Sequence, residues 1–196
     1  MSQRSLREGI LNAGLKVMFR SGYVGASVRD ICAVARAPQG SFTNHFRSKE
    51  AFVEEVLDRY FASVQAAVSE VFNDKSLKPR QRLKRYLDII SGRLAGDKWS
   101  RGCLIGDLSL EASLQSKPLR KRLEEIFLAW RRPFAECIAE GQAAGEIASK
   151  FDPVDLAEFF LASWEGAILR MKVDGGPAAL DRFKDIVFRT VFKEEK

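Results

Sequence analysis

Residues 27–50 read SVRDICAVARAPQGSFTNHFRSKE and contain two short helical patterns in succession. The first opens with Ser27-Val28-Arg29-Asp30, where the Ser27 hydroxyl can accept a hydrogen bond from an N–H of the first turn and Asp30 can reach back. Pro38 restarts the chain after a turn, because its fixed φ and missing N–H cost little at the start of a helix. We therefore predict two helices joined by a tight turn.

The second pattern, from Gln39 to Phe46, is too polar to fill a hydrophobic core. Phe42 and Phe46 are its apolar anchors, and its other side chains are small or polar. A helix, a tight turn and a short polar helix are how the helix-turn-helix motif places a recognition helix in the major groove of DNA. The residues that we assign to DNA binding are Ser27, Arg29, Gln39, Gly40, Ser41, Thr43, Asn44, His45 and Lys49.

A longer run, residues 10–56, resembles the DNA-binding domain of the TetR family of bacterial repressors. The matching residues are Gly22, Ser27-Val28-Arg29-Asp30-Ile31, Ala35, Gly40-Ser41-Phe42, His45-Phe46 and Ser48-Lys49-Glu50. Three positions depart from the family pattern: Arg36 replaces a turn glycine, Pro38 a capping Ser or Thr, and Thr43 a tyrosine that often touches a phosphate. The resemblance implies a three-helix DNA-binding head followed by a variable helical domain for ligand binding and dimerisation.

Positive charge is concentrated at the same end of the chain. Residues 1–50 hold eight Lys or Arg against three acids, which gives +5 of the total +6. The other residues hold 24 against 23, which gives +1. A basic segment can simply be a solvated face, but one that coincides with a helix-turn-helix is the electrostatic footprint of a nucleic-acid partner.

The rest of the chain reads as helical, so the predicted fold class is all-α. Prolines stand where helices should begin, and no run alternates with the period of a strand. We expect helices near 6–20, 48–72, 79–95, 104–115, 118–144, 153–173 and 177–193. The predicted domains are a DNA-binding domain at 1–50 and an effector-binding and dimerisation domain at 51–196, linked by the Ser48–Phe72 helix.

The composition of the chain indicates the cellular compartment in which we expect the protein. No apolar run approaches the length that spans a bilayer, and no charged-then-apolar leader begins the chain. Three cysteines, an odd number without a leader, fit a reducing cytoplasm better than a disulfide framework. We expect a bacterial cytoplasmic protein that makes no membrane contact and is associated with the nucleoid when bound to DNA.

Cys103 lies in a second informative stretch, residues 100–111, SRGCLIGDLSLE. A thiol at a helix N-terminus beside a cation, here Arg101, has its thiolate favoured, although a cysteine is more often a small buried hydrophobe. Gly102-Cys103-Leu104, followed by Gly106 and Glu111, resembles a TetR subfamily that includes repressors responsive to N-ethylmaleimide and other electrophiles. The resemblance implies an effector- or redox-sensing role for Cys103, with Arg101 beside it.

A reversible small-molecule effector is the alternative to a thiol sensor. Its pocket would lie between the middle helices, although plain core packing explains the same aromatic residues equally well. The candidate walls are Trp99, Leu104, Leu108, Phe127, Trp130, Phe134 and Trp164. The last two helices carry apolar faces too heavy for so small a domain, and the resemblance implies that they pair with their mates in a homodimer.

Taken together, these patterns predict a transcriptional regulator, most simply a repressor released from a palindromic operator in double-stranded DNA by a small-molecule or thiol-reactive effector. An enzyme is disfavoured: the single histidine, His45, lies on the recognition helix, and no metal cluster, nucleophile elbow or phosphate-binding loop appears. No cofactor is expected. A constitutive DNA-binding protein without an effector is the remaining alternative, and the size of the second domain argues against it.

Overall fold

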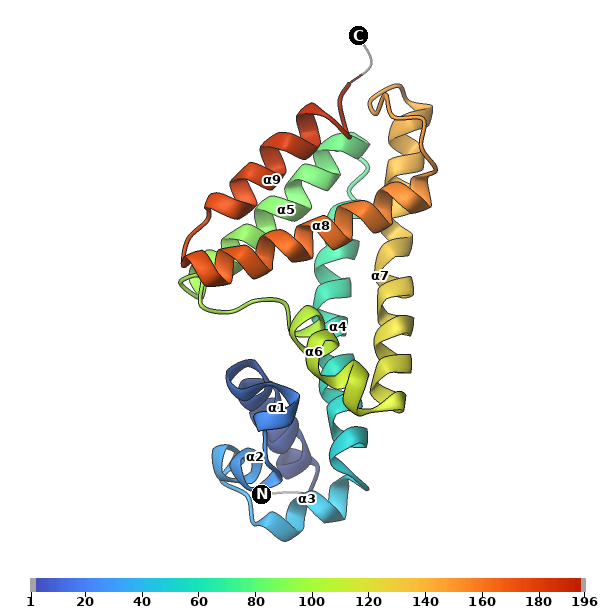
Figure 1. The fold of residues 1–196 in the computed structure, drawn as a ribbon. Coiled ribbons are helices and arrows are strands. Elements are labelled where there is room, and N and C mark those ends of the chain that lie inside the picture. Colours follow the sequence, from blue (N-terminus) through green and yellow to red (C-terminus); the bar gives the residue numbers. More distant parts are fainter. Residues whose placement is uncertain (1–2, 195–196) are drawn as a thin grey trace. The chain divides into compact units, whose positions relative to one another are not determined.

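A computed structural model describes residues 3–194, which form helices joined by turns and contain no strand in that range (Figure 1). The predicted all-α class is confirmed. None of the helices described is both long and apolar enough to cross a membrane. The elements are α1 (Gln3–Gly25), α2 (Val28–Ala35), α3 (Gln39–His45), α4 (Lys49–Phe72), α5 (Pro79–Gly96), α6 (Leu104–Gln115), α7 (Lys117–Ala143), α8 (Pro153–Asp174) and α9 (Ala178–Arg189).

Two helix ends differ from the sequence prediction by four residues or more, each for a visible reason. α1 does not stop at Gly22: the helical angles are interrupted there (φ 66°, ψ −169°) and helical turns resume as far as Gly25. α9 ends at Arg189 instead of near residue 193. Beyond it the chain turns so that the fully buried Phe192 reaches the core, and the Phe192 N–H donates to the Val187 carbonyl.

The chain divides into two compact units. The first comprises the chain up to Ser63 together with Leu104–Ile126, and the second comprises Val64–Cys103 together with the chain from Phe127 onward. Helix α6 and the first turns of α7 therefore belong to the same unit as α1–α3, although they lie far away in the sequence, and α6 contacts α1. These units are defined by contacts and not by function, so the boundary at residue 50 between a DNA-binding and an effector-binding domain stays a prediction.

The core of the first unit fixes α3 through three phenylalanine rings. Phe42 and Phe46 of the α3 region are almost fully buried, and their ring centroids lie 5.0 and 4.8 Å from that of Phe52 in α4. Gly14 lets α1 approach this cluster, because a β-carbon there would lie 2.2 Å from the Phe52 ring. The phenylalanine anchors of α3 thus face inward, as the sequence predicted.

The core of the second unit is built from aromatic residues of α5, α7 and α8. The ring of Phe134 stands edge-on to Tyr86, with 4.9 Å between centroids, and lies 5.6 Å from Phe160. Helices α8 and α9 pack side by side (Figure 1), and Trp164 contacts Phe183 across that pair. Most of the apolar face predicted for these two helices is therefore core of this unit.

Three helices end with the same hydrogen-bond pattern but with different residues in the left-handed position. At the ends of α2, α5 and α7, the N–H of one residue donates to the carbonyl three residues earlier. The N–H of the next residue donates to the carbonyl five residues earlier. The left-handed residue is Gly145 after α7 (φ 71°), but Arg36 after α2 (φ 52°) and Lys98 after α5 (φ 53°). Glycine is favoured there because it has no β-carbon, so two basic residues hold a strained position.

Candidate functional site

The start of α2 is fixed by the cap that the sequence predicted. The Asp30 N–H donates to Ser27 Oγ over 3.1 Å, and the Ser27 hydroxyl donates to Asp30 Oδ2 over 2.5 Å. The hydroxyl holds the pKa of Asp30 below its ordinary value. Asp30 thus reaches back to the serine side chain, and Ser27 serves to fix where α2 begins.

Helix α3 separates an anchored face from an exposed one. Phe42 points into the core, whereas Gln39, Gly40, Thr43 and Asn44 are exposed and Ser41 and His45 are half-buried. The Thr43 hydroxyl donates to the Gly40 carbonyl over 3.0 Å, so its proton is used within the helix. Arg29 is exposed on α2. An exposed polar face on an anchored short helix can present hydrogen-bonding groups to a nucleic-acid groove.

Lys49, predicted to meet a phosphate, has a partner inside the protein. Its ammonium donates to the Tyr23 carbonyl over 2.6 Å and lies 4.7 Å from the centre of the Tyr23 ring. Desolvation lowers the pKa of Lys49, and the carboxylate of Glu111 opposes that effect. An ammonium group has three hydrogens, so the bond to Tyr23 leaves others for a phosphate oxygen.

Cys103 directly precedes α6, at the helix start that the sequence predicted. Its side chain is buried, with a residue exposure of 7%. The neighbouring Arg101 is exposed, and its guanidinium lies 3.5 Å from the Asp97 carboxylate, which offsets part of its charge. Burial raises the pKa of the Tyr86 phenol, and Cys103 and Glu165 add to that rise.

The candidate ligand walls are divided between the two units. Trp130, Phe134 and Trp164 are packed in the core of the second unit, and Phe127 is half-buried against Trp130. Leu104 and Leu108 are buried in the first unit. Trp99 is half-buried and follows Lys98 in the left-handed region, with φ 60°. One of the seven, Trp130, reaches the cleft described next.

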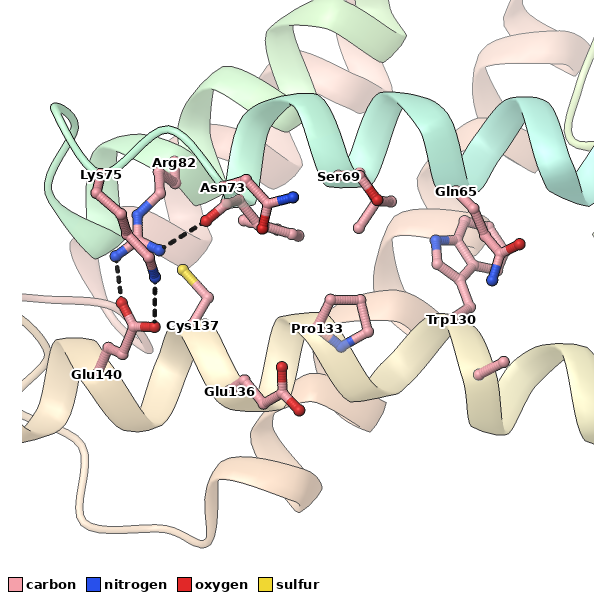
Figure 2. Close-up of a pocket in the computed structure, with 13 residues that line it drawn as sticks. Gln65, Ser69, Asn73, Lys75, Arg82, Trp130, Pro133, Glu136, Cys137 and Glu140 are labelled. Carbon is pink, nitrogen blue, oxygen red and sulfur yellow. Dashed lines mark hydrogen bonds and ion pairs between the residues drawn. The ribbon is translucent and has the colours of Figure 1, made fainter.

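A cleft of about 220 Å³ lies between the end of α4 and α7 (Figure 2). Gln65, Ser69 and Asn73 line it from one side at four-residue spacing, with Trp130 and Pro133 opposite. At one end the Lys75 ammonium and the Arg82 guanidinium both bond Glu140, over 2.8 and 2.5 Å. Glu136 also lines the cleft, so its wall carries two cations and two carboxylates.

Arg82 is a functional candidate that the sequence did not indicate. Its residue exposure is 3%, Nη1 donates to the Phe72 carbonyl over 3.0 Å, and Nε has no hydrogen-bond partner. The sequence places Arg82 in a run of charged residues, and nothing in that run distinguishes it from its exposed neighbours. Cys137 lies beside it, and burial raises the pKa of the Cys137 thiol to about 12, which makes that thiol a poor nucleophile.

Comparison with known proteins gives two family matches and several relatives. Residues 10–56 match the model "Bacterial regulatory proteins, tetR family", and residues 79–187 match "Tetracyclin repressor-like, C-terminal domain". The HTH-type transcriptional repressor DhaR of Mycobacterium sp. (strain GP1) is 42% identical over 97% of this chain and 94% of its own length. The transcriptional regulator AcuR of Cereibacter sphaeroides is 36% identical over 90% of this chain and 80% of its own length.

Solved structures agree with these matches. A regulatory protein TetR from Rhodobacter sphaeroides superposes with a TM-score of 0.89 at 33% identity, covering 94% of this chain and 97% of that one. The reduced form of NemR from E. coli superposes with a TM-score of 0.84 at 24% identity, covering 95% and 97%. With both halves of the chain matched and a helix-turn-helix in place, this protein belongs to the TetR family of bacterial regulatory proteins.

Proposed function

We propose that this protein is a homodimeric transcriptional repressor that leaves a palindromic operator when an effector acts on its second domain. The observation that supports this most directly is α3, which exposes Gln39 and Asn44 while Phe42 is anchored in the core. Relatives named as repressors, DhaR and NemR among them, support repression over activation.

In this proposal α3 reads bases and its surroundings hold the DNA backbone. Gln39 and Asn44 carry amides that can pair with adenine edges, and Arg29 can reach a guanine or a phosphate. Ser41, Thr43 and His45 complete the recognition helix, and the small Gly40 allows close approach to the backbone. Lys49 contacts a phosphate with hydrogens that Tyr23 does not use. The +5 charge of residues 1–50 supports this orientation toward DNA.

Homodimerisation would use α8 and α9. Phe159 and Ile186 are 52% and 53% exposed on these helices, and both line a groove of about 330 Å³ between them. Leu169 and Val173 are further exposed apolar residues of α8. Apolar side chains in this number are unusual on a free surface, and a two-fold mate would cover them. Two heads could then engage two half-sites of one operator.

The effector would act at Cys103 or in the cleft between α4 and α7. Cys103 has the sequence pattern of an electrophile sensor and lies at the start of α6, where a helix N-terminus favours the thiolate. The cleft is lined by two cations and two carboxylates and suits a small polar compound. We favour Cys103, because its sequence context is the more specific signal.

A mobility-shift titration on the DNA upstream of the protein's own coding region tests the proposal. We expect a retarded complex at low protein concentration, no complex on scrambled DNA of equal length, and release when N-ethylmaleimide is added. Sedimentation should give the mass of a dimer. Binding to both DNAs alike would contradict operator recognition. Specific binding that no thiol reagent or metabolite relieves would favour the constitutive alternative.

A further inference from the structure

Helix α1 is interrupted just before the helix-turn-helix begins. At Gly22 the backbone adopts φ 66° and ψ −169°, a combination that residues with a β-carbon almost never adopt. Only the segment from Tyr23 to Ala26 separates this break from Ser27, the cap of α2. The geometry of the break therefore sets how the chain enters the DNA-reading motif.

The carboxylate of Glu111, on α6, covers the break. Its Oε2 accepts a hydrogen bond from the Val24 N–H over 3.1 Å, across 87 residues of sequence. Gly22 lies directly beneath it, since a β-carbon there would be 2.1 Å from Oε1 and 2.5 Å from Oε2. The glycine is thus required twice, once for its backbone angles and once to admit the carboxylate.

The same break is held from its other side by the first residue of α4. The Lys49 ammonium donates to the carbonyl of Tyr23, the residue between Gly22 and Val24. Glu111 is near enough to Lys49 to affect its pKa. One peptide segment is therefore bonded at its N–H to α6 and at its carbonyl to α4, and α4 begins four residues after α3 ends.

We propose that Glu111 is the positioning residue through which α6 sets the DNA-binding geometry of the head. Helix α6 begins at the residue after Cys103, and Glu111 lies about 10 Å further along it. A shift or partial unwinding of α6 would withdraw the carboxylate from Val24, release the break in α1 and change the direction in which α2 and α3 are presented. This inference deepens, and rests on, the proposed control of DNA binding by an effector.

Two substitutions at Glu111 separate positioning from charge. Glu111→Gln keeps an oxygen that can accept from the Val24 N–H, whereas Glu111→Ala removes it. Glu124→Ala is the matched control, since Glu124 is an exposed acid of the same unit whose partner, Arg120, is exposed as well. All variants are made in the full-length chain, and thermal unfolding confirms that each is folded.

Amide hydrogen exchange tests the contact without any DNA or effector. We expect Glu111→Ala to accelerate exchange at residues 22–26 about tenfold, the scale of one lost charge-assisted hydrogen bond. Amides of α8 should exchange as in the wild type. Glu111→Gln should restore most of the protection, and Glu124→Ala should leave it unchanged. Unaltered exchange at residues 22–26 in Glu111→Ala overturns the contact itself.

Operator titrations then test the consequence. Glu111→Ala should weaken operator binding about tenfold in the absence of effector and leave random DNA unaffected, with rescue by Glu111→Gln. Wild-type operator affinity in Glu111→Ala overturns the positioning role. If the wild type shows no preference for the operator, the proposed function is wrong. The hydrogen-exchange measurement then remains the test of the bond between Glu111 and Val24. Where N-ethylmaleimide releases the wild type, it should change the affinity of Glu111→Ala several-fold less.

Discussion

The carboxylate of Glu111 and the α-carbon of Gly22 are so close that no side chain fits between them. A β-carbon on Gly22 would lie only 2.1 Å from Oε1 of Glu111, so the carboxylate occupies the space that a side chain would need. Two residues far apart in sequence therefore constrain each other: the glycine has to stay bare, and the acid has to stay in place.

Gly22→Ala should destabilise the protein. The alanine would have to hold φ 66° and displace the Glu111 carboxylate, and each such backbone strain costs about 1–3 kcal/mol. Chemical denaturation should show a loss of at least that size. Gly9→Ala, in the same helix with open space around its α-carbon, is the control and should be neutral or slightly stabilising. Equal stability of the two variants would contradict the close approach.

Gln39→Ala should reduce affinity for the cognate operator by about 1–3 kcal/mol and leave random DNA almost unchanged. The reason is that an exposed amide at the start of α3 is free to pair with a base edge, which only the cognate site provides in register. Gln115→Ala, an exposed glutamine at the end of α6, is the matched control. Equal losses on both DNAs would show that Gln39 does not read bases.

Cys103→Ser should bind the operator and remain bound after N-ethylmaleimide, whereas Cys32→Ser and Cys137→Ser should still be released. Burial raises the pKa of both Cys32 and Cys137, the latter to about 12, so neither supplies much thiolate near neutral pH. Mass spectrometry of the treated wild type should find the adduct on Cys103. Release of Cys103→Ser as readily as the wild type would make a reversible ligand the leading account.

Arg36→Gly should stabilise the protein by up to about 1 kcal/mol. Arg36 holds φ 52° and ψ 40° at the end of α2, where a β-carbon is unfavourable, and glycine removes that strain. Gly145→Ala changes the equivalent position after α7 in the opposite direction and should destabilise. Urea unfolding gives the free energy of unfolding of each variant for comparison with the wild type. A stability loss in Arg36→Gly would mean that the arginine side chain makes contacts worth more than the strain.

Glu140→Gln should lower stability at neutral pH by about 1 kcal/mol, a modest value because the carboxylate is partly exposed. Hydrogen bonds from Lys75 and Arg82 hold the pKa of Glu140 below its ordinary 4.5. The folded protein thus favours the charged form, so this stability is present above the ordinary value and is lost as pH falls through the lowered one. The difference between wild type and variant should shrink when unfolding is measured near about pH 3.

Local signals in the sequence predicted the helices well. Ser27 caps the helix that it is predicted to begin, α8 starts at the predicted residue 153 with Asp152 as its cap, and α6 spans the predicted 104–115. These features depend on neighbouring residues and repeat spacing alone. The end of α9 was predicted too late in the chain. The helix stops at Arg189 so that Phe192 can be buried, and the site where Phe192 packs is formed by other helices.

The contacts that organise the candidate sites were not predictable in the same way. Gly22 and Glu111 both belong to quoted motifs, yet periodicity gives the face of a helix and never its partner in a distant segment. The hydrogen bond from Val24 to Glu111 spans 87 residues. Arg82 lies in the sequence RQRLKR at 80–85, where a buried guanidinium is indistinguishable from solvated ones. A hydrogen bond between distant segments leaves no trace in a single sequence.

Pro133 has a consequence for chemical recognition in the cleft between α4 and α7. A proline in the interior of α7 has no N–H to give to the carbonyl of Ala129, four residues earlier, and both residues line the cleft. The Ala129 carbonyl, on a residue that lines the cleft, thus lacks its usual helical donor, and a bound hydroxyl or amine could supply one. No side-chain substitution at Ala129 would remove this carbonyl. Pro133→Ala would supply the missing N–H, which would then occupy the carbonyl in a helical hydrogen bond.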